Sequence, residues 1–166
     1  MISYGPARES DTATLAALHA ASFSRDWSRD EFARLLSAPG SRALLAWRES
    51  DDSPAGFLMA RTVAGEAEVL TIAVAPEHRR HGVAKNLMKR LFDDLRHRRI
   101  TAVFLEVGAE NKPALLLYGG FGFAEIGRRP GYYGGSAPGD ALVLRASLAV
   151  PAMVSKSAET DYEKPV

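Results

Sequence analysis

Residues 70–85 read LTIAVAPEHRRHGVAK, and this stretch decides the fold. Residues 70–74 are apolar or β-branched, which is typical of a buried strand. After a short polar loop, apolar residues recur every four positions, which predicts a helix over roughly 81–98. The residues of that apolar stripe are Val83, Leu87, Leu91 and Leu95, flanked by Met88 and Phe92. A strand, a loop and a long helix therefore follow one another here.

The loop between that strand and helix carries the features of an anion site. A helix N-terminus presents unpaired N–H groups and the positive end of the helix dipole. Gly82 lets the backbone approach a ligand closely, and Ala84 keeps the next contact uncrowded. Arg79 and Arg80 add positive charge, so the loop suits a pyrophosphate. The alternative is a tight turn with solvated arginines. The loop has neither the Lys-Ser/Thr pair of a P-loop nor the three glycines of a dinucleotide fingerprint.

The rest of the chain alternates strand and helix patterns. Strands are predicted at residues 2–4, 42–48, 56–63, 66–74, 101–107, 121–127 and 141–148. Helices are predicted after Asp11, which would act as N-cap, from Ser28 to Pro39, at 81–98 and at 111–118. Ser28 and Glu31 form the capping-box pattern, and residues 128–140 are predicted as a loop rich in Gly and Tyr. The order β-α-α-β-β-β-α-β-α-β-β indicates an α/β or α+β sandwich around one sheet.

Composition narrows the function classes. The 166 residues, 46% of them hydrophobic, suffice for one domain with a sizeable core. Lys and Arg number 21 against 20 Asp and Glu, so we expect neither a nucleic-acid nor a membrane partner. No cysteine is present, and the four histidines lack metal-ligand spacing, so we expect no metal site. The first ten residues show no signal segment, which predicts a cytoplasmic protein. Residues 149–166 are predicted to form a flexible tail.

Two motifs resemble the GNAT superfamily, the GCN5-related N-acetyltransferases. The first is Arg79-x-x-Gly82-x-Ala84, and the second runs Asn111-x-x-Ala114-x-x-x-Tyr118-x-x-x-Gly122-Phe123. The resemblance covers residues 1–148 and implies a single GNAT domain. Its sheet would be mixed, mostly antiparallel, of about seven strands flanked by four helices. Two of its strands would splay apart to form an acetyl-CoA cleft.

Within the superfamily the chain is similar to the RimI-like group, the ribosomal-protein alanine N-acetyltransferases. The shared features are Trp27-Ser28, the run FLEV at 104–107, Asn111 followed by Tyr118, and Tyr132-Tyr133. The resemblance implies acetyl-CoA as co-substrate, bound by backbone groups and loop residues. These are Ile72, Ala73, Val74, Arg79, Arg80, His81, Gly82, Val83, Ala84, Lys85 and Asn111. For Asn111, a plain helix N-cap is an alternative that can hold at the same time.

The same resemblance implies the catalytic pair. Glu106 would be the general base that receives the amine's proton, and Tyr118 the general acid that protonates the leaving thiolate. On an otherwise apolar strand, Glu106 is either poised by desolvation, which would raise its pKa, or paired with an arginine. Tyr118 could instead be a core tyrosine with a satisfied hydroxyl. Trp27, Tyr132 and Tyr133 would line the acceptor groove, with simple packing as the alternative.

The acceptor stays open at this point. A peptide or protein N-terminus, with a ribosomal protein as leading candidate, is one reading, and a small-molecule amine is the other. A catalytically silent acyl-CoA sensor is a third. Gly108 stands where RimI-like proteins commonly carry arginine, and Gly119-Gly120 replaces a polar pair. These departures bear on the acceptor and leave the acetyl-CoA prediction intact.

Overall fold

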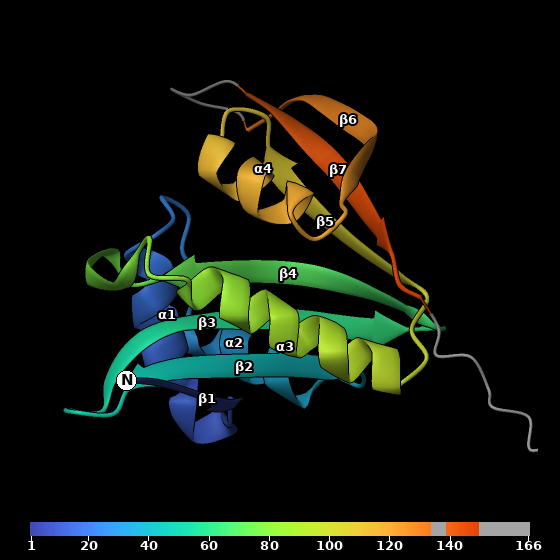
Figure 1. Ribbon diagram of the computed structural model, residues 1–166. Coiled ribbons are helices and arrows are strands. Elements are labelled where there is room, and N and C mark those ends of the chain that lie inside the picture. The colour runs from blue at the N-terminus through green and yellow to red at the C-terminus, as the bar shows by residue number, and fades with distance from the viewer. Residues whose placement is uncertain (134–138, 150–166) are drawn as a thin grey trace, which may run out of the picture.

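The computed structural model describes residues 1–133 and 139–149, with the side chains of residues 132 and 133 excluded. The strands are β1 (Ile2–Pro6), β2 (Ser41–Arg48), β3 (Ser53–Val63), β4 (Glu66–Val74), β5 (Ala102–Gly108), β6 (Ala124–Tyr133) and β7 (Gly139–Ser147). The helices are α1 (Thr12–Ala20), α2 (Arg29–Ser37), α3 (Val83–His97) and α4 (Lys112–Gly119), with 3-10 turns at Glu9–Asp11 and Pro76–His78. This is the predicted order (Figure 1). Residues 150–166 of the predicted tail and 134–138 of the predicted loop lie outside the described residues.

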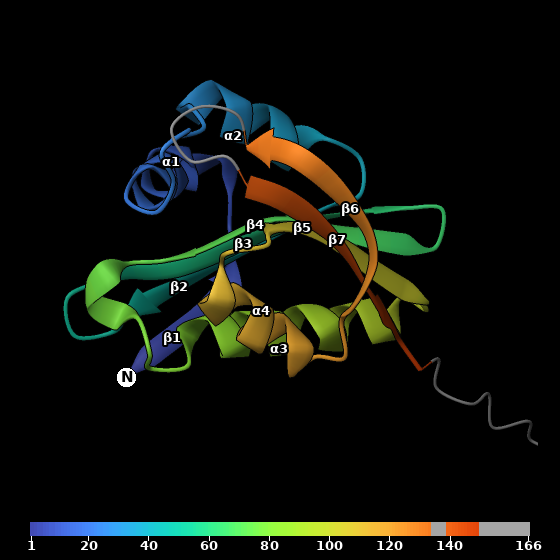
Figure 2. The same cartoon turned by 90° about the horizontal axis from the view of Figure 1, so that it is seen from above.

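All seven strands form one sheet, in the order β1-β2-β3-β4-β5-β7-β6. The β4–β5 pair is parallel, and every other neighbouring pair is antiparallel, which confirms the mixed, mostly antiparallel sheet. Helices α1 and α2 cover one face, and α3 and α4 cover the other (Figure 2). No helix in the described part of the chain is long and apolar enough to cross a membrane.

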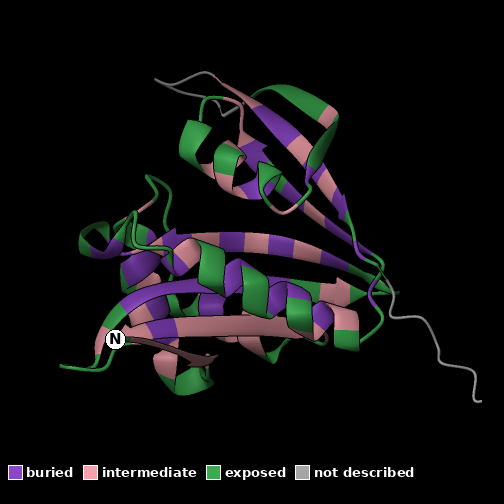
Figure 3. Cartoon of the chain, viewed as in Figure 1, coloured by how far each residue is buried: buried purple, intermediate pink, exposed green. Residues whose placement is uncertain are grey.

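Each face of the sheet has its own hydrophobic core. The α3 stripe predicted from the sequence is buried against the sheet, with Val83, Leu87, Leu91 and Leu95 at most 2% exposed. This core also includes side chains of β4, β5, β7 and α4. On the other face, Leu15 and Leu18 of α1 pack with Phe32 of α2 and Phe57 of β3. Buried and exposed residues alternate accordingly along the helices (Figure 3).

Of the three candidate N-caps, Ser28 and Asn111 cap their helices with a side chain, and Asp11 does not. The Ser28 hydroxyl accepts the Glu31 N–H at 3.2 Å, and the Glu31 carboxylate accepts the Ser28 N–H at 2.6 Å, which completes the capping box. Asp11 does occupy the N-cap position of α1, but its side chain caps no helical N–H group. Its carboxylate instead accepts the Arg8 N–H at 2.7 Å, because a 3-10 turn precedes the helix.

The prediction for the last two strands was wrong in its bounds. The predicted loop 128–140 is largely strand, because β6 continues to residue 133 and β7 already begins at 139. Asp140 joins the two strands: it accepts the Arg128 guanidinium at 2.9 Å and the Gly131 N–H at 3.0 Å. Residues 121–123 are no strand; Gly122 has a φ of +81° and the Phe123 N–H bonds back to Tyr118 at the end of α4. The glycine-rich composition therefore gave no sign of this part of β6, because its pairing with β7 is what stabilises it.

Candidate functional site

The sheet opens between its two parallel strands. The last β4–β5 pair is Val69 with Leu105, although β4 continues to Val74 and β5 to Gly108. A β-bulge lies at the same place, because Met59 pairs with Thr71 and Ala60 with Val69, which leaves Leu70 as an extra residue. Beyond it the two strands diverge (Figure 1). The predicted splay is thus present.

Divergence leaves one edge of β4 without a strand beside it. Within residues 1–133 and 139–149, no strand pairs with the β5-facing side of residues 70–74. The predicted cofactor residues Ile72, Ala73 and Val74 all belong to this edge. An open strand edge offers N–H and C=O groups to an extended ligand. The backbone therefore fits an arm with amide groups, such as pantetheine.

The end of β4 leads into the predicted anion loop. Arg80 has a φ of +63° and Gly82 a φ of +78°, so α3 begins at Val83 and not at the predicted residue 81. The first N–H that bonds back into this turn is that of Asn86, to Gly82 at 3.0 Å. Among the described residues, the backbone N–H groups of residues 80–85 make no backbone hydrogen bond of normal length and angle. Consecutive free N–H groups near left-handed residues form a concave anion site.

The side chains of that loop divide into two kinds. Arg79 supports the structure: its Nε donates to the Val74 carbonyl at 3.1 Å and its guanidinium approaches the Ser22 hydroxyl at 3.4 Å. Arg80, His81 and Lys85 are exposed. Gly82 is required by its φ rather than by crowding inside the protein, because an added Cβ would meet only the Asn86 amide at 3.8 Å. The anion site is therefore made of backbone, with cations around it.

Glu106 lies one residue beyond the last β4–β5 pair. Its neighbours Leu105 and Val107 point into the core under α3, so Glu106 is on the face of α1 and α2. Its side chain is 30% exposed, and Oε1 lies 3.0 Å from a guanidinium nitrogen of Arg129. Of the two surroundings that the sequence left open, the arginine partner is the one present. The sequence did not identify Arg129.

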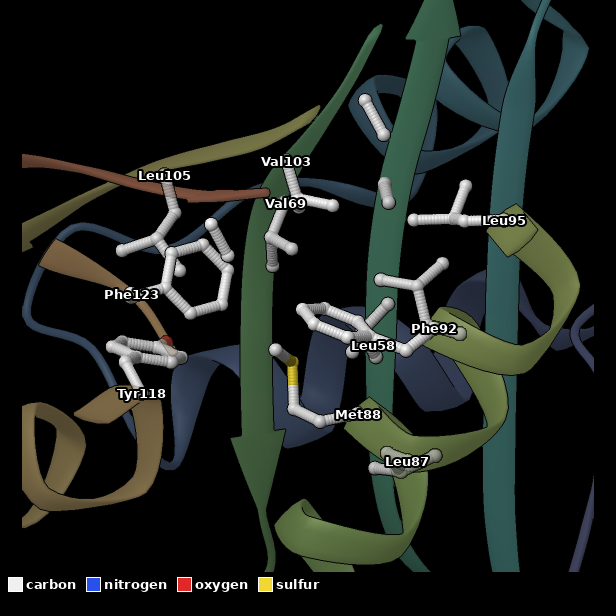
Figure 4. Packing of buried hydrophobic residues seen from close by; sticks show 14 of the residues in the cluster. Leu58, Val69, Leu87, Met88, Phe92, Leu95, Val103, Leu105, Tyr118 and Phe123 are labelled. Atoms are coloured by element: carbon white, nitrogen blue, oxygen red, sulfur yellow. The ribbon is translucent and has the colours of Figure 1, made fainter. Parts of the chain in front are cut away.

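Tyr118 and Asn111 lie at the two ends of α4. Tyr118 is 6% exposed, and its ring packs edge-on against Phe123 with centroids 5.7 Å apart (Figure 4). Asn111 caps the helix, since its side-chain oxygen accepts the Ala114 N–H at 3.3 Å. The N-cap alternative for Asn111 is therefore present, and so is the core packing of the Tyr118 ring. Each contact is compatible with a functional role for the same residue, so neither contact decides that role.

Trp27 is held in the α1–α2 connection by a residue that the sequence analysis missed. Its backbone N–H donates to Nδ1 of His19 at 3.2 Å, and the two rings stack with centroids 4.8 Å apart. His19 is 3% exposed, and burial lowers its pKa, while Asp26 and Glu31 act weakly in the opposite direction. Because Nδ1 accepts a hydrogen bond, the ring is neutral. The available signal was position: His19 follows Leu15 by four residues on the apolar face of α1.

The remaining predictions concern the aromatic wall of the acceptor groove and the metal site. Tyr132 and Tyr133 close β6 with their backbone, and their side chains lie outside the described residues. In the described part of the chain, no group of three or more His, Asp or Glu side chains could hold a metal ion.

Comparison with known proteins adds to this geometry. The model of the acetyltransferase (GNAT) family matches residues 12–123. The [ribosomal protein bS18]-alanine N-acetyltransferase of Salmonella typhimurium is 36% identical over 107 residues, which cover 64% of this chain and 70% of that protein. Among solved structures, the ribosomal-protein-S18-alanine N-acetyltransferase of Escherichia coli superposes with a TM-score of 0.84 at 24% identity, covering 93% of this chain and 98% of that one. Arabidopsis thaliana NAA60 in complex with acetyl-CoA has a TM-score of 0.79 at 20% identity, with 89% and 99% covered.

Proposed function

The chain belongs to the acetyltransferase (GNAT) family, and from this premise we propose that it acetylates the N-terminal α-amine of a protein. That it is an acetyl-CoA-dependent N-acetyltransferase follows from the family. The N-terminal acceptor is supported by the relative that acts on an alanine of ribosomal protein bS18. A ribosomal protein is therefore the first acceptor to test.

The observation that carries the proposal is the position of Glu106. Its carboxylate lies where β4 and β5 part, on the sheet face that also carries the α1–α2 connection with Trp27. An acceptor entering from that side meets an anion next to the open edge of β4. A protonated α-amine is a cation, so the carboxylate would attract it; the amine loses one proton to solvent before it attacks as the neutral nucleophile.

The donor side would be held by backbone groups. The free N–H groups of residues 80–85 suit the pyrophosphate, and the open edge of residues 70–74 suits the pantetheine arm. Asn111 would contact the same arm while capping α4. Acetyl-CoA supplies a thioester whose carbonyl carbon is open to attack.

We assign two proton transfers to this chain. As the acceptor nitrogen bonds to the acetyl carbon and the C–S bond breaks, Glu106 receives the proton that the nitrogen loses. Tyr118 donates a proton to the departing sulfur, because a phenol O–H is a proton donor and a thiolate is a base. Burial of Tyr118 beside Phe123 keeps its ring in one orientation.

Glu106→Gln tests this proposal, with Glu68→Gln as matched control. Glu68 is also a strand carboxylate on the same face, 41% exposed and paired with Arg61 at 2.8 Å, but it lies where β4 and β5 still pair. We measure CoA release with Ala-starting peptides and with a panel of small amines. The expected result is turnover of peptides, with kcat reduced about a hundredfold in Glu106→Gln and unchanged in Glu68→Gln.

Two outcomes would contradict the proposal. Turnover of small amines without peptides would reassign the acceptor to a small molecule. Wild-type rates in Glu106→Gln across pH would show that Glu106 is not the base.

A further inference from the structure

Several residues near Glu106 on this face of the sheet have small side chains or none. On the face of α1 and α2, residues of β5, β7 and β6 stand in rows across the strands. One row is Glu106, Val143 and Gly127, and the next is Gly108, Ala141 and Arg129. Because Gly108, Gly127 and Ala141 have small side chains or none, they project little above this face of the sheet. A long side chain on β6 can therefore lie across β7 and reach β5.

Arg129 is the residue that does so. Its guanidinium lies 3.0 Å from Oε1 of Glu106, with the two side chains 57% and 30% exposed. The other arginines of the β6–β7 hairpin have different partners. Arg128 bonds Asp140 and Glu125, and Arg145 bonds the Ser147 hydroxyl at 2.7 Å and lies over the Phe104 ring.

We propose that Arg129 is a positioning residue for the acetyl transfer: it holds the Glu106 carboxylate at the point where β4 and β5 part. This inference rests on the proposed role of Glu106 as base. A glutamate has three side-chain torsions, and a base must lie within hydrogen-bond reach of the proton it receives. Gly108, two residues along the strand, has no side chain to restrict Glu106, whereas Arg129 contacts the carboxylate itself at 3.0 Å.

The proton inventory of the step is unaffected by Arg129. The carboxylate gains the proton that the attacking nitrogen loses, and the guanidinium keeps all of its own, because arginine is not deprotonated in proteins. Arg129 therefore changes where the carboxylate lies. A half-exposed ion pair has modest strength, so its loss reduces the rate without abolishing it.

The test is a double-mutant cycle with Arg129→Gln and Glu106→Gln. We measure kcat and KM for an Ala-starting peptide and for acetyl-CoA. Arg129→Gln is expected to lower kcat about fivefold, the upper range for an exposed pair, with both KM values within about twofold. Arg129→Lys, which keeps the charge, should fall between. In the Glu106→Gln background, Arg129→Gln should lower kcat no further, because the carboxylate that it positions is no longer there.

Arg145→Gln is the matched control, since Arg145 is a cation on the same face in the next row. We expect it to keep wild-type kcat, and thermal melts establish that all variants fold. A rise in peptide KM at constant kcat would show that Arg129 contacts the acceptor directly, and an equal loss in the Glu106→Gln background would show that it acts independently; either overturns the inference. Wild-type kcat in Arg129→Gln with an impaired Glu106→Gln refutes this inference alone. Wild-type activity of Glu106→Gln refutes the proposed base itself.

Discussion

Gly82 allows the anion loop to be tested without changing its charge. Gly82 and Gly65, in the β3–β4 turn, have nearly equal left-handed φ angles of +78° and +81°. An added Cβ would meet only the Asn86 amide at 3.8 Å in the first case and nothing within 4 Å in the second. Alanine at either position therefore introduces backbone strain and no steric overlap. The two substitutions form a matched pair that differs in location.

The expected cost follows from the backbone. A left-handed φ disfavours a residue with a Cβ by ~1–2 kcal/mol. Alanine also restricts the unfolded chain, which returns about 0.4–1 kcal/mol. Each variant should therefore lose about 1 kcal/mol of unfolding free energy, or about 2–4 °C in Tm for a chain of this size. In Gly82→Ala the backbone also relieves part of this strain by turning the N–H groups of the loop away, so the acetyl-CoA Kd should rise about fivefold.

Urea unfolding and titration calorimetry with acetyl-CoA provide the two readouts. Both variants should lose similar stability, whereas only Gly82→Ala should bind acetyl-CoA more weakly. An equal loss of affinity in Gly65→Ala would show that binding follows general stability. Unchanged affinity in Gly82→Ala would refute the assignment of the pyrophosphate to this loop.

Two further substitutions test buried polar groups. Thr71 is 8% exposed and its hydroxyl has no hydrogen-bond partner among the described residues, so Thr71→Val should raise the unfolding free energy by about 1 kcal/mol in urea melts; lower stability would contradict this. The lowered pKa of His19 means that the unfolded chain binds the proton better, so stability falls as pH drops through about 6.5. His19→Asn, which keeps an acceptor for the Trp27 N–H, should flatten the urea midpoint between pH 7.5 and 5.5; an unchanged slope would exclude His19.

Local signals predicted most of the fold. The apolar stripe of α3, the capping box at Ser28 and the position of Pro113 early in α4 depend on residues a few positions apart. Asp11 failed as a side-chain cap because the turn before α1 used its carboxylate first. The bounds of β6 failed because its pairing with β7, and not its own composition, determines where it ends.

For the site too, features formed by neighbouring residues could be predicted and features formed by distant segments could not. The anion loop could be predicted, because a strand, a glycine and a helix start are adjacent in the chain. The tie from Arg79 to Ser22 and the pair between Glu106 and Arg129 could not, because each joins segments that only the folded sheet brings together. His19 was missed for a related reason: a histidine on an apolar helix face gives no sign of which backbone group it will bond.

Leu70, the extra residue of the bulge in β4, lies where the proposed donor and acceptor sides of the site meet. Before Leu70, Ala67 and Val69 face the core under α3; after it, Ile72 also packs toward that core while Ala73 packs under α1 and α2. If the alternation from Val69 continued unbroken, Ile72 would face α1 and α2 and Ala73 would face α3. The extra residue therefore reverses the faces of these two side chains. A bulge also increases strand twist, and here β4 leaves β5 directly after it. The residue that breaks the alternation is thus where the sheet opens, which frees the edge of residues 70–74 and places Glu106 beside it.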